Sequence, residues 1–538
     1  MSLSHAKSIA VLGTGSDVGK SLITAGLCRL LHRAGVRVAP FKAQNMSLNS
    51  FVTPDGGEMG RAQVLQAQAC GLAPHVDMNP VLLKPEGEAK SQVIVQGKVW
   101  RSQNARDYFD RKSQVFPFVK ESYDRLAEQY EVIVIEGAGS AAEMNLRDRD
   151  IVNWPVVEMA DAAVVLVADI DRGGVFAQVI GTMDLLAPEE RRRVIGVVIN
   201  KFRGDLTLFE DGIQILEDRT GVPVLGVVPY LRNLELDQED SVDIERSRMT
   251  SFEPETVNIA VVLLPHMSNF TDFNQLGAEP DVALRYVSNW KDIQGADVVI
   301  LPGSKTTIAD LDYLKGREFE QTLQGHQERG GEVVGICGGF QMLGLEVTDP
   351  HEVETGGAAK GFGLLNISTE LSREKQTVQV TARPLFCGAA NDCVVEGYEI
   401  HMGQTTSSTG IAPCFEIIRH AETAPSSQRV LSSKEHAQEA RGSNGLDGAM
   451  RADGLVWGTY IHGVFDRPAF RRAWLNRVRA RKLLPALDVE VSRVVSSRLD
   501  QALDRWADHV SAHLHLGPLY SAISLPKILV SPVSSQGC

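Results

Sequence analysis

Two short glycine-containing segments carry residues that could do chemistry, and each would do a different kind. The first runs from Gly13 to Ser21 and ends in Gly-Lys-Ser after an apolar stretch. A glycine-rich turn between a strand and a helix presents backbone N–H groups to phosphates at the positive end of the helix dipole. The second is Gly335-Ile336-Cys337-Gly338-Gly339, with His462 far downstream. It predicts a thiolate that attacks a carbonyl carbon.

The first segment predicts a site for ATP and Mg²⁺. We expect the Lys20 ammonium to neutralise the β- and γ-phosphates and the Ser21 hydroxyl to ligate Mg²⁺. Glu136 ends an apolar run, where open α/β sheets place their ligands, and is the candidate second metal ligand; the alternative is a carboxylate that caps a helix. The residues expected to bind the nucleotide are Gly13, Gly15, Val18, Gly19, Lys20, Ser21, Asn200 and Lys201.

Charged residues are dense in two further segments, 145–150 and 169–174. Arginines bind carboxylates through two parallel hydrogen bonds, and aspartates can hold a metal. We therefore expect an acidic substrate to lie here, beside the γ-phosphate. A solvated charged surface is an equally open alternative, as it is for the loop at Asn200 and Lys201. The candidate substrate contacts in these segments are Arg147, Asp148, Asp150 and Arg172.

The second segment has the pattern of a nucleophile elbow built on cysteine. A sharp turn at a helix N-terminus exposes the sulfur and favours the thiolate. The small Gly338 and Gly339 allow backbone N–H groups to approach a developing oxyanion, and Gly303 with Ser304 could supply a second donor. His462 is the expected general base. Many enzymes of this type place Glu two residues after the histidine, but position 464 is valine, so the group that orients the imidazole is left open.

Composition limits the remaining possibilities. The chain has 538 residues, of which 43% are hydrophobic and 23% charged, which is typical of an ordinary globular protein with two to four domains. The net charge of −14 argues against nucleic acid as a partner. We find no stretch of the roughly 18 apolar residues that a membrane span needs, no signal peptide and no CxxC pair, so we expect a cytoplasmic protein.

Short, continuously apolar runs alternate with helical patterns and predict two doubly wound α/β domains. In the first domain, residues 7–230, the runs are 9–12, 36–39, 132–135, 163–168 and 194–199. An acidic linker is expected at 231–255. The second domain is expected at 256–475, with a polar insertion loop at 426–453. A helical tail with a frayed end is expected at 476–538.

Several of these motifs together resemble a known family. The loop around Gly13 is one residue longer than usual and is similar to the dethiobiotin synthetase-like branch of phosphate-loop enzymes. Residues 41–50 (FKAQNMSLNS), 136–140, 301–306, 335–344 and 397–403 (GYEIHMG) closely resemble the cobyric acid synthase family of cobalamin biosynthesis. The resemblance covers most of residues 7–475 in the family's order. It implies a dethiobiotin synthetase-like P-loop domain followed by a class I glutamine amidotransferase-like domain.

The resemblance also implies a reaction. Members amidate four peripheral carboxylates, b, d, e and g, of the corrinoid adenosylcobyrinic a,c-diamide, using one ATP and one glutamine for each. We place Lys42 and Asn45, in the first matching stretch, among the residues that contact the corrinoid. No protein partner is expected. The nearest alternative is the sister enzyme that amidates the a and c carboxylates of cobyrinic acid. A partitioning-type ATPase is a further alternative, but it would not explain Cys337, and its usual early lysine is missing between Gly13 and Gly15.

Overall fold

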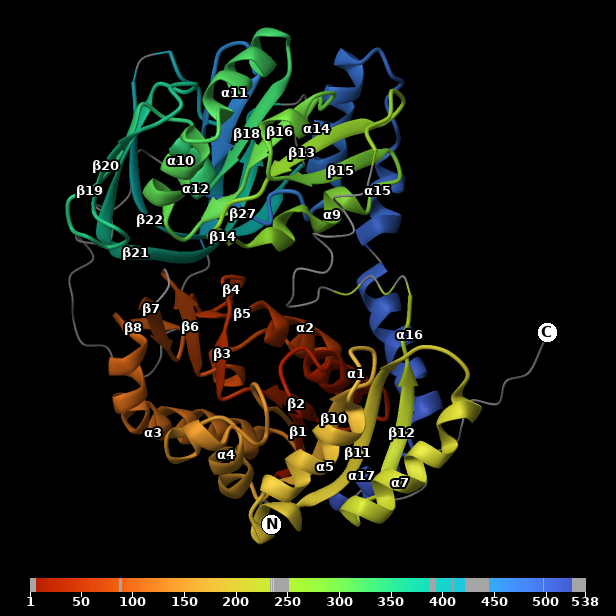
Figure 1. Cartoon of the computed structure of the whole chain (residues 1–538). Helices are drawn as coiled ribbons and strands as arrows, with labels where there is room; N and C mark the ends of the chain where they lie inside the picture. The colour runs from red at the N-terminus through yellow and green to blue at the C-terminus, as the bar shows by residue number, and fades with distance from the viewer. Residues whose placement is uncertain are drawn as a thin grey trace.

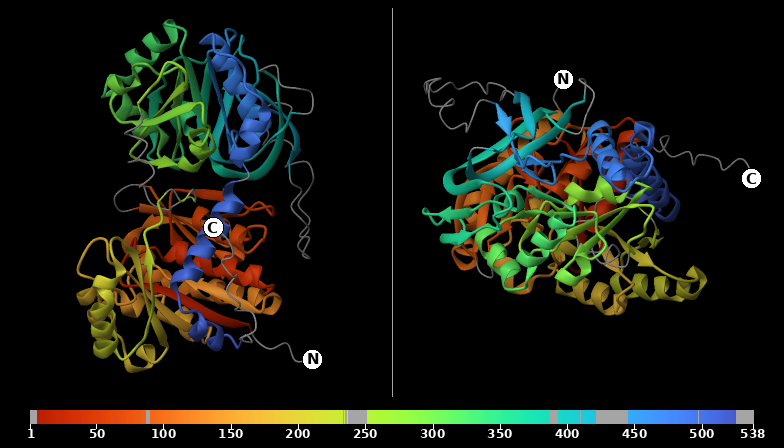
Figure 2. Two further views of the ribbon diagram at one scale, coloured as in Figure 1. Left: turned by 90° about the vertical axis from the view of Figure 1, so that its right-hand side faces the viewer. Right: turned by 90° about the horizontal axis from the view of Figure 1, so that it is seen from above.

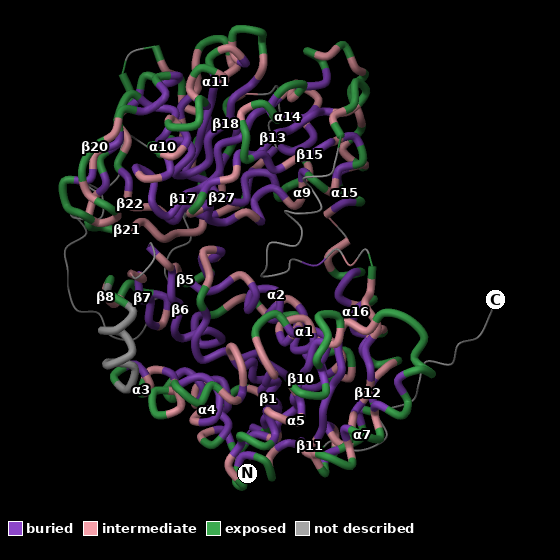
Figure 3. Tube along the Cα trace, in the orientation of Figure 1, coloured by how far each residue is buried: buried purple, intermediate pink, exposed green. Residues whose placement is uncertain are grey.

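The computed structural model describes residues 6–86, 90–232, 234, 236, 251–386, 393–408, 410–420, 445–496 and 498–524. Two lobes lie one above the other, the first half of the chain in one and most of the second half in the other (Figures 1 and 2). Buried segments follow the strands in the middle of each lobe (Figure 3). Within the described residues, no helix is long and apolar enough to cross a membrane.

The first lobe is built on a six-stranded parallel sheet in the order β12-β11-β10-β1-β9-β2. Its strands are buried on both faces, which explains their continuous apolarity. Four of the five predicted apolar runs of this domain lie wholly on strands of the sheet, and the run at 36–39 overlaps β2 at its last two residues. The strands are β1 (Lys7–Gly13), β2 (Val38–Phe41), β9 (Val132–Glu136), β10 (Ala163–Asp169), β11 (Val194–Phe202) and β12 (Val224–Pro229).

Helices cover this sheet, and a smaller sheet lies toward the second lobe. The helices and 3₁₀ turns are α1 (Lys20–Arg33), α2 (Arg61–Ala69), η1 (Val76–Met78), α3 (Ala105–Gln129), η2 (Met144–Arg149), α4 (Trp154–Met159), α5 (Val175–Leu185), α6 (Pro188–Arg191), η3 (Leu206–Phe209) and α7 (Glu210–Thr220). The smaller sheet has the order β3-β6-β7-β8, and a two-stranded hairpin lies beside it. These strands are β3 (Gln44–Met46), β4 (Ser50–Val52), β5 (Glu58–Gly60), β6 (Val81–Pro85), β7 (Lys90–Val95) and β8 (Lys98–Asn104).

The second lobe has a sheet in the order β15-β13-β16-β18-β26-β25, parallel except for its last strand. It confirms the second α/β domain. The strands are β13 (Val257–Val262), β15 (Val282–Val287), β16 (Val298–Leu301), β18 (Glu332–Ile336), β25 (Ala449–Met450) and β26 (Val456–Thr459). The helices and turns are η4 (Phe270–Phe273), α9 (Asn274–Gly277), η5 (Trp290–Ile293), α10 (Thr307–Lys315), α11 (Phe319–Glu328), α12 (Gly338–Met342) and α14 (Pro468–Arg481).

A second, mostly antiparallel sheet faces the first lobe. Its order is β20-β19-β21-β22-β27, with β23 and β24 attached. Val52 of β4 packs against Tyr398 and Ile400 of β22, so apolar contact joins the lobes. The strands are β14 (Met267–Ser268), β17 (Gly303–Ser304), β19 (Glu346–Asp349), β20 (Gly357–Lys360), β21 (Ile367–Pro384), β22 (Val395–Ser407), β23 (Phe415–His420), β24 (Leu446–Asp447) and β27 (Ile461–His462), with β14 and β17 forming a separate pair.

The C-terminal helices return to the first lobe. After α15 (Val489–Ser496), helix α16 (Arg498–His513) packs along α1, and α17 (Gly517–Ala522) follows it (Figure 2). Gly26 of α1 makes the close approach possible, because a Cβ there would lie 3.0 Å from both Trp506 and Val510. Arg29 Nε donates to Asp504 Oδ1 over 2.8 Å. The tail is thus part of the first lobe's core.

Parts of the predicted organisation fall where the structure gives no description. Most of the predicted linker (233, 235 and 237–250), most of the predicted insertion loop (426–444) and the end of the chain (525–538) lie outside the described residues. The boundary expected at residue 475 falls inside α14 (Pro468–Arg481). The predicted domain limits otherwise stay predictions.

Candidate functional site

The glycine-rich loop lies between β1 and α1, as the sequence predicts. Gly19 has a φ of 95°, and a Cβ on it would lie 2.2 Å from Asn200 Nδ2. Asn200 in turn donates to the Val18 carbonyl over 2.9 Å, so the loop after β11 braces the phosphate loop. Lys201 supports the same loop, since its ammonium pairs with Asp169 at 3.1 Å and donates to the Asp17 carbonyl.

The Lys20 ammonium lies over the loop that precedes it. It donates to the Gly15 carbonyl over 2.8 Å and to the Gly139 carbonyl over 2.9 Å. The Gly139 contact places the loop after β9 against the phosphate loop. This arrangement places one cation where phosphate oxygens would meet the N-terminus of α1.

Glu136 is the centre of a buried polar cluster beside the loop. Its carboxylate accepts hydrogen bonds from Ser21 Oγ over 2.7 Å, Lys42 Nζ over 2.9 Å and Gln66 Nε2 over 2.5 Å. Burial alone would raise the pKa of Glu136, but the Lys42 ammonium and these hydrogen bonds hold it below its ordinary value. The carboxylate is therefore ionised at neutral pH.

The pair of Ser21 hydroxyl and Glu136 carboxylate fits a Mg²⁺ ion. Both are oxygen ligands, and Mg²⁺ is usually held by one or two protein oxygens with phosphates and waters completing its octahedron. Among the described residues there is no cluster of three or more His, Cys, Asp or Glu side chains that could hold a metal alone. A Mg²⁺ ion at this place would be held by Ser21 and Glu136 together with phosphates and waters.

A cavity of about 990 Å³ opens beside this cluster. The second lobe contributes Met267 and Phe270 to it, and the returning helix α16 contributes Trp506. The predicted site residues that line it are Gly19, Lys20, Ser21, Lys42, Asn45, Glu136, Arg172, Asn200 and Lys201.

Three predicted substrate contacts do not line this cavity. Arg147 pairs with Glu190 and donates to the Leu185 carbonyl. Asp150 accepts hydrogen bonds from the backbone N–H groups at the start of α4, including that of Trp154 at 3.1 Å. Asp148 is exposed. In this structure Arg147 and Asp150 have nearby structural partners instead.

Cys337 occupies the strained turn between β18 and α12. Its φ is 51° and its ψ −109°, a conformation that a non-glycine residue rarely adopts. The glycines around it are required by space: a Cβ on Gly339 would lie 2.0 Å from the Leu301 carbonyl oxygen, and one on Gly338 would lie 2.8 Å from the Ser304 nitrogen. The Gly338 turn and the β17 backbone therefore meet beside the sulfur, as an oxyanion site requires.

The structure brings His462 to Cys337 and supplies a third group that sequence reasoning missed. His462 Nδ1 donates to Asp272 Oδ2 over 2.7 Å, and Asp272 Oδ1 accepts from the Gly463 N–H over 3.0 Å. Burial alone would lower the pKa of His462, but the charges of Asp272 and Cys337 and its hydrogen bonds with both raise it to about 10. The imidazole is thus protonated at neutral pH.

The cavity at Cys337 is narrow, at about 40 Å³. Besides Cys337 and His462 it is lined by Ser304 and Gly338, and by Lys84 from the first lobe. Gly303, next to Ser304, would place a Cβ 3.2 Å from His462 Cε1. Because one wall belongs to the other lobe, the shape of this cavity depends on how the lobes contact each other.

One segment separates the two cavities. Met267 and Phe270 line the large one, while Ser268 and Asn269 line the narrow one. Asn269 Oδ1 accepts the Ser50 N–H over 3.0 Å, and Asn49 Oδ1 accepts the Phe270 N–H over 3.1 Å. This reciprocal pair fixes the partition, residues 267–270, to the first lobe.

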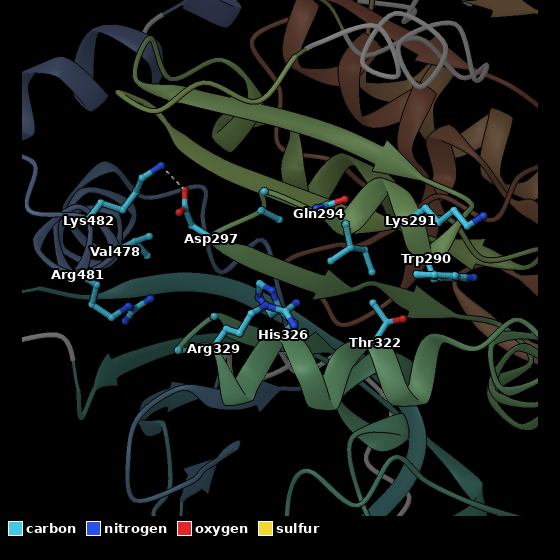
Figure 4. A pocket seen from close by; sticks show the side chains of 15 residues that line it. Trp290, Lys291, Gln294, Asp297, Thr322, His326, Arg329, Val478, Arg481 and Lys482 are labelled. Atoms are coloured by element: carbon cyan, nitrogen blue, oxygen red, sulfur yellow. Dashed lines mark hydrogen bonds and ion pairs between the residues drawn. The ribbon is translucent and has the colours of Figure 1, made fainter.

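A third cavity, of about 980 Å³, lies elsewhere on the second lobe (Figure 4). It is at the amino ends of β16 and β18, whereas Cys337 follows the carboxyl end of β18. Two of its cations have local acidic partners: Lys482 pairs with Asp297 at 2.8 Å, and Arg481 pairs with Glu332. Among the described residues, none that belongs to the phosphate-loop site or to the Cys337 site lines this third cavity. We therefore assign it no role in phosphate binding or in the reaction at Cys337.

Comparison with known proteins gives two family matches. Residues 9–243 match the CobQ/CobB/MinD/ParA nucleotide binding domain, and residues 258–470 match the CobB/CobQ-like glutamine amidotransferase domain. The cobyric acid synthase of Citrobacter koseri is 47% identical over 96% of this chain and 98% of its own. That of Syntrophobacter fumaroxidans is 44% identical over 97% of this chain and 100% of its own. That of Salmonella typhimurium is 46% identical, over 96% and 98% respectively.

Proposed function

The chain belongs to the cobyric acid synthase family, and we propose that it is a cytoplasmic enzyme that converts adenosylcobyrinic a,c-diamide into adenosylcobyric acid. The b, d, e and g carboxylates each become an amide, and each step uses one ATP and one glutamine. The observation that carries this proposal is the pair of cavities on either side of one four-residue partition. One cavity holds a phosphate loop, and the other holds a Cys–His–Asp triad.

The first lobe activates the carboxylate. A carboxylate oxygen attacks the γ-phosphorus of ATP, giving an acyl phosphate and ADP, and this turns a poor electrophile into a good one. Lys20 and the N-terminus of α1 hold the phosphates. Ser21 and Glu136 would hold Mg²⁺, which neutralises charge on the phosphate oxygens when bound. The volume of the cavity, about 990 Å³, suits a large ring substrate that must present several carboxylates in turn.

The second lobe supplies ammonia. The Cys337 thiolate attacks the carboxamide carbon of glutamine, and backbone N–H groups at Gly338 and Ser304 stabilise the oxyanion. The His462 imidazolium gives its proton to the departing nitrogen, so ammonia leaves and a γ-glutamyl thioester remains. His462 then takes a proton from water as it hydrolyses the thioester, and glutamate is released. Asp272 holds the ring in the orientation that both steps need.

Ammonia has to reach the acyl phosphate without meeting bulk water, because protonation would remove its nucleophilicity. We propose that it crosses the partition, residues 267–270, beside Asn269 and Ser50. Its attack on the acyl carbon gives the amide and inorganic phosphate. The position of this segment between the two cavities supports the route.

The test is mass spectrometry of the corrinoid after incubation with Mg-ATP and glutamine, comparing the wild type with Cys337→Ala. The proposal expects four amides with the wild type. With the variant it expects four amides from ammonium salts and none from glutamine. If the wild type hydrolyses glutamine but leaves this corrinoid unchanged, the substrate assignment is wrong, and cobyrinic acid is the next substrate to test.

A further inference from the structure

The narrow cavity carries charges that the thioester chemistry does not use. Three lysines line it, Lys84, Lys305 and Lys375. Among the described residues that line it, Glu354 is the one acidic side chain. Glutamine carries both an α-carboxylate and an α-ammonium group, and a specific site for it needs both signs of charge near the end of the molecule away from the carboxamide.

The lysines already have buried carboxylates as partners. Lys84 and Lys375 both pair with Glu58, at 2.8 and 2.5 Å. Lys305 pairs with Glu86 at 2.9 Å. Each ammonium has three N–H donors, so these pairs leave a donor for a further acceptor in the cavity. An α-carboxylate of glutamine would find such donors on this side.

Glu354 is differently placed. Its Oε2 accepts the Thr307 N–H at the start of α10 over 2.6 Å. Thr307 in turn adjoins the oxyanion turn, because a Cβ on Gly338 would lie 3.2 Å from Thr307 Oγ1. Glu354 is half-buried, and it lines the cavity. The hydrogen bond from the Thr307 N–H accounts for Oε2 of Glu354 as a cap of α10. The Glu354 carboxylate also lines the cavity that contains Cys337.

A positively charged group beside Glu354 would change the ionisation of this carboxyl. Burial raises the pKa of this carboxyl to about 7, although the Lys305 ammonium opposes the rise. Glu58, which has two lysine partners, instead has its pKa lowered. A positive group placed beside Glu354 would stabilise its ionised form.

We infer that Glu354 receives the α-ammonium group of the nitrogen donor and thereby selects glutamine over carboxamides that lack an α-amino group. This inference rests on the proposed glutaminase activity of the same cavity. The cavity, at about 40 Å³, holds only a few waters, so glutamine enters when its walls move apart. The wall supplied by Lys84 belongs to the first lobe, and opening therefore involves the contact between the lobes.

The experiment uses the full-length protein and two donors, L-glutamine and glutaramate, which is glutamine without its α-amino group. Ammonia release gives kcat/KM for each donor with the wild type, Glu354→Gln and Glu354→Asp. Glu352→Gln is the matched control, because Glu352 is exposed two residues away and does not line the cavity.

We expect the wild type to prefer glutamine. Glu354→Gln should reduce the ratio of the two kcat/KM values by about 10- to 100-fold, the size expected for a lost charge-assisted hydrogen bond. The loss should be in KM for glutamine, with the glutaramate values nearly unchanged. Glu354→Asp should reduce the ratio less, and Glu352→Gln should leave it unchanged.

An equal loss for both donors in Glu354→Gln would overturn the inference and leave Glu354 as a cap of α10. If this variant does not fold, Glu354→Asp decides the question, because an unchanged ratio in it contradicts the inference equally. A wild type that releases ammonia from neither donor would instead contradict the proposed function.

Discussion

The two cavities of this molecule differ in size and in what closes them. The one beside the phosphate loop measures about 990 Å³ and draws its walls from both lobes and from the returning tail. The one beside Cys337 measures about 40 Å³ and is closed by charged side chains paired across the lobes. The proposed reaction would use this difference. Presenting several carboxylates of one large substrate requires space, and keeping ammonia away from bulk water requires an enclosed cavity.

The largest expected effect separates the two sites by nitrogen source. Lys20→Ala should lower amidation by at least about 10³-fold with glutamine and with ammonium alike, because phosphate positioning and charge stabilisation are lost. Cys337→Ala should lose only the reaction with glutamine. Corrinoid amides counted by mass spectrometry check both variants. If Lys20→Ala still used ammonium well, the division of labour between the cavities would be wrong.

The triad gives the next largest effect. Asp272→Asn should reduce ammonia release from glutamine by about 10²- to 10⁴-fold, because the imidazolium loses its counter-charge and its orientation. Asp272 raises the pKa of His462, which is about 10. The alkaline loss of activity should therefore come well above neutral pH in the wild type, as the pH rises toward 10, and at lower pH in the variant. Glutaminase rates across a pH series, with ammonium-dependent amidation as the control, provide the measurement.

The charged wall of the narrow cavity should matter for stability. Glu58 pairs with Lys84 of its own lobe and Lys375 of the other, and all three side chains are at most 11% exposed. Glu58→Gln leaves two buried ammonium groups without a counter-charge, so we expect a loss of ~3–5 kcal/mol and a fall in Tm of about 6–12 °C. The exposed Asp508→Asn, which removes the ion pair with Arg33, should change Tm by no more than ~2 °C. Thermal denaturation at one pH compares the two.

Loosening the partition should have the smallest effect. It should change the amount of glutamate released per amide formed, and not the rate of amidation. Asn269→Ala removes the acceptor of the Ser50 N–H and loosens the partition. We expect roughly two- to fivefold more glutamate released per amide formed, since one hydrogen bond contributes about 1 kcal/mol. Parallel assays of glutamate and of amidated corrinoid measure this ratio. An unchanged ratio would contradict a route for ammonia past Asn269.

Local motifs explain which parts of these sites could be predicted from the sequence. The phosphate loop and the cysteine turn are each set by a few adjacent residues, and the structure places both between a strand and a helix. Asp272 could not be predicted in this way, because it lies 190 positions from His462 and belongs to a short 3₁₀ turn without a motif. Arg147 and Asp150 show the limit of charge density as a signal: it suggested a binding role, and the structure gives both residues nearby structural partners.

The tail was the other feature that periodicity could only partly predict. A helical pattern indicates that α16 exists, but not which surface it covers. Its site is fixed by Gly26, which lets Trp506 and Val510 approach α1. In the sequence, the contact between α1 and α16 is marked only by one glycine inside a helix. Such a glycine does not show which segment packs against it.

The return of α16 to α1 has a consequence for biosynthesis. The glutamine amidotransferase lobe is nested inside the sequence of the other lobe, so a ribosome finishes it before releasing the helix that completes the first core. Until then the nascent chain carries α1 with its outer apolar face uncovered. Domains usually fold from the N-terminus onward during translation. Here the lobe that begins first is the one that finishes last, and a chain that stops near residue 495 would hold a complete second lobe beside an unfinished first one.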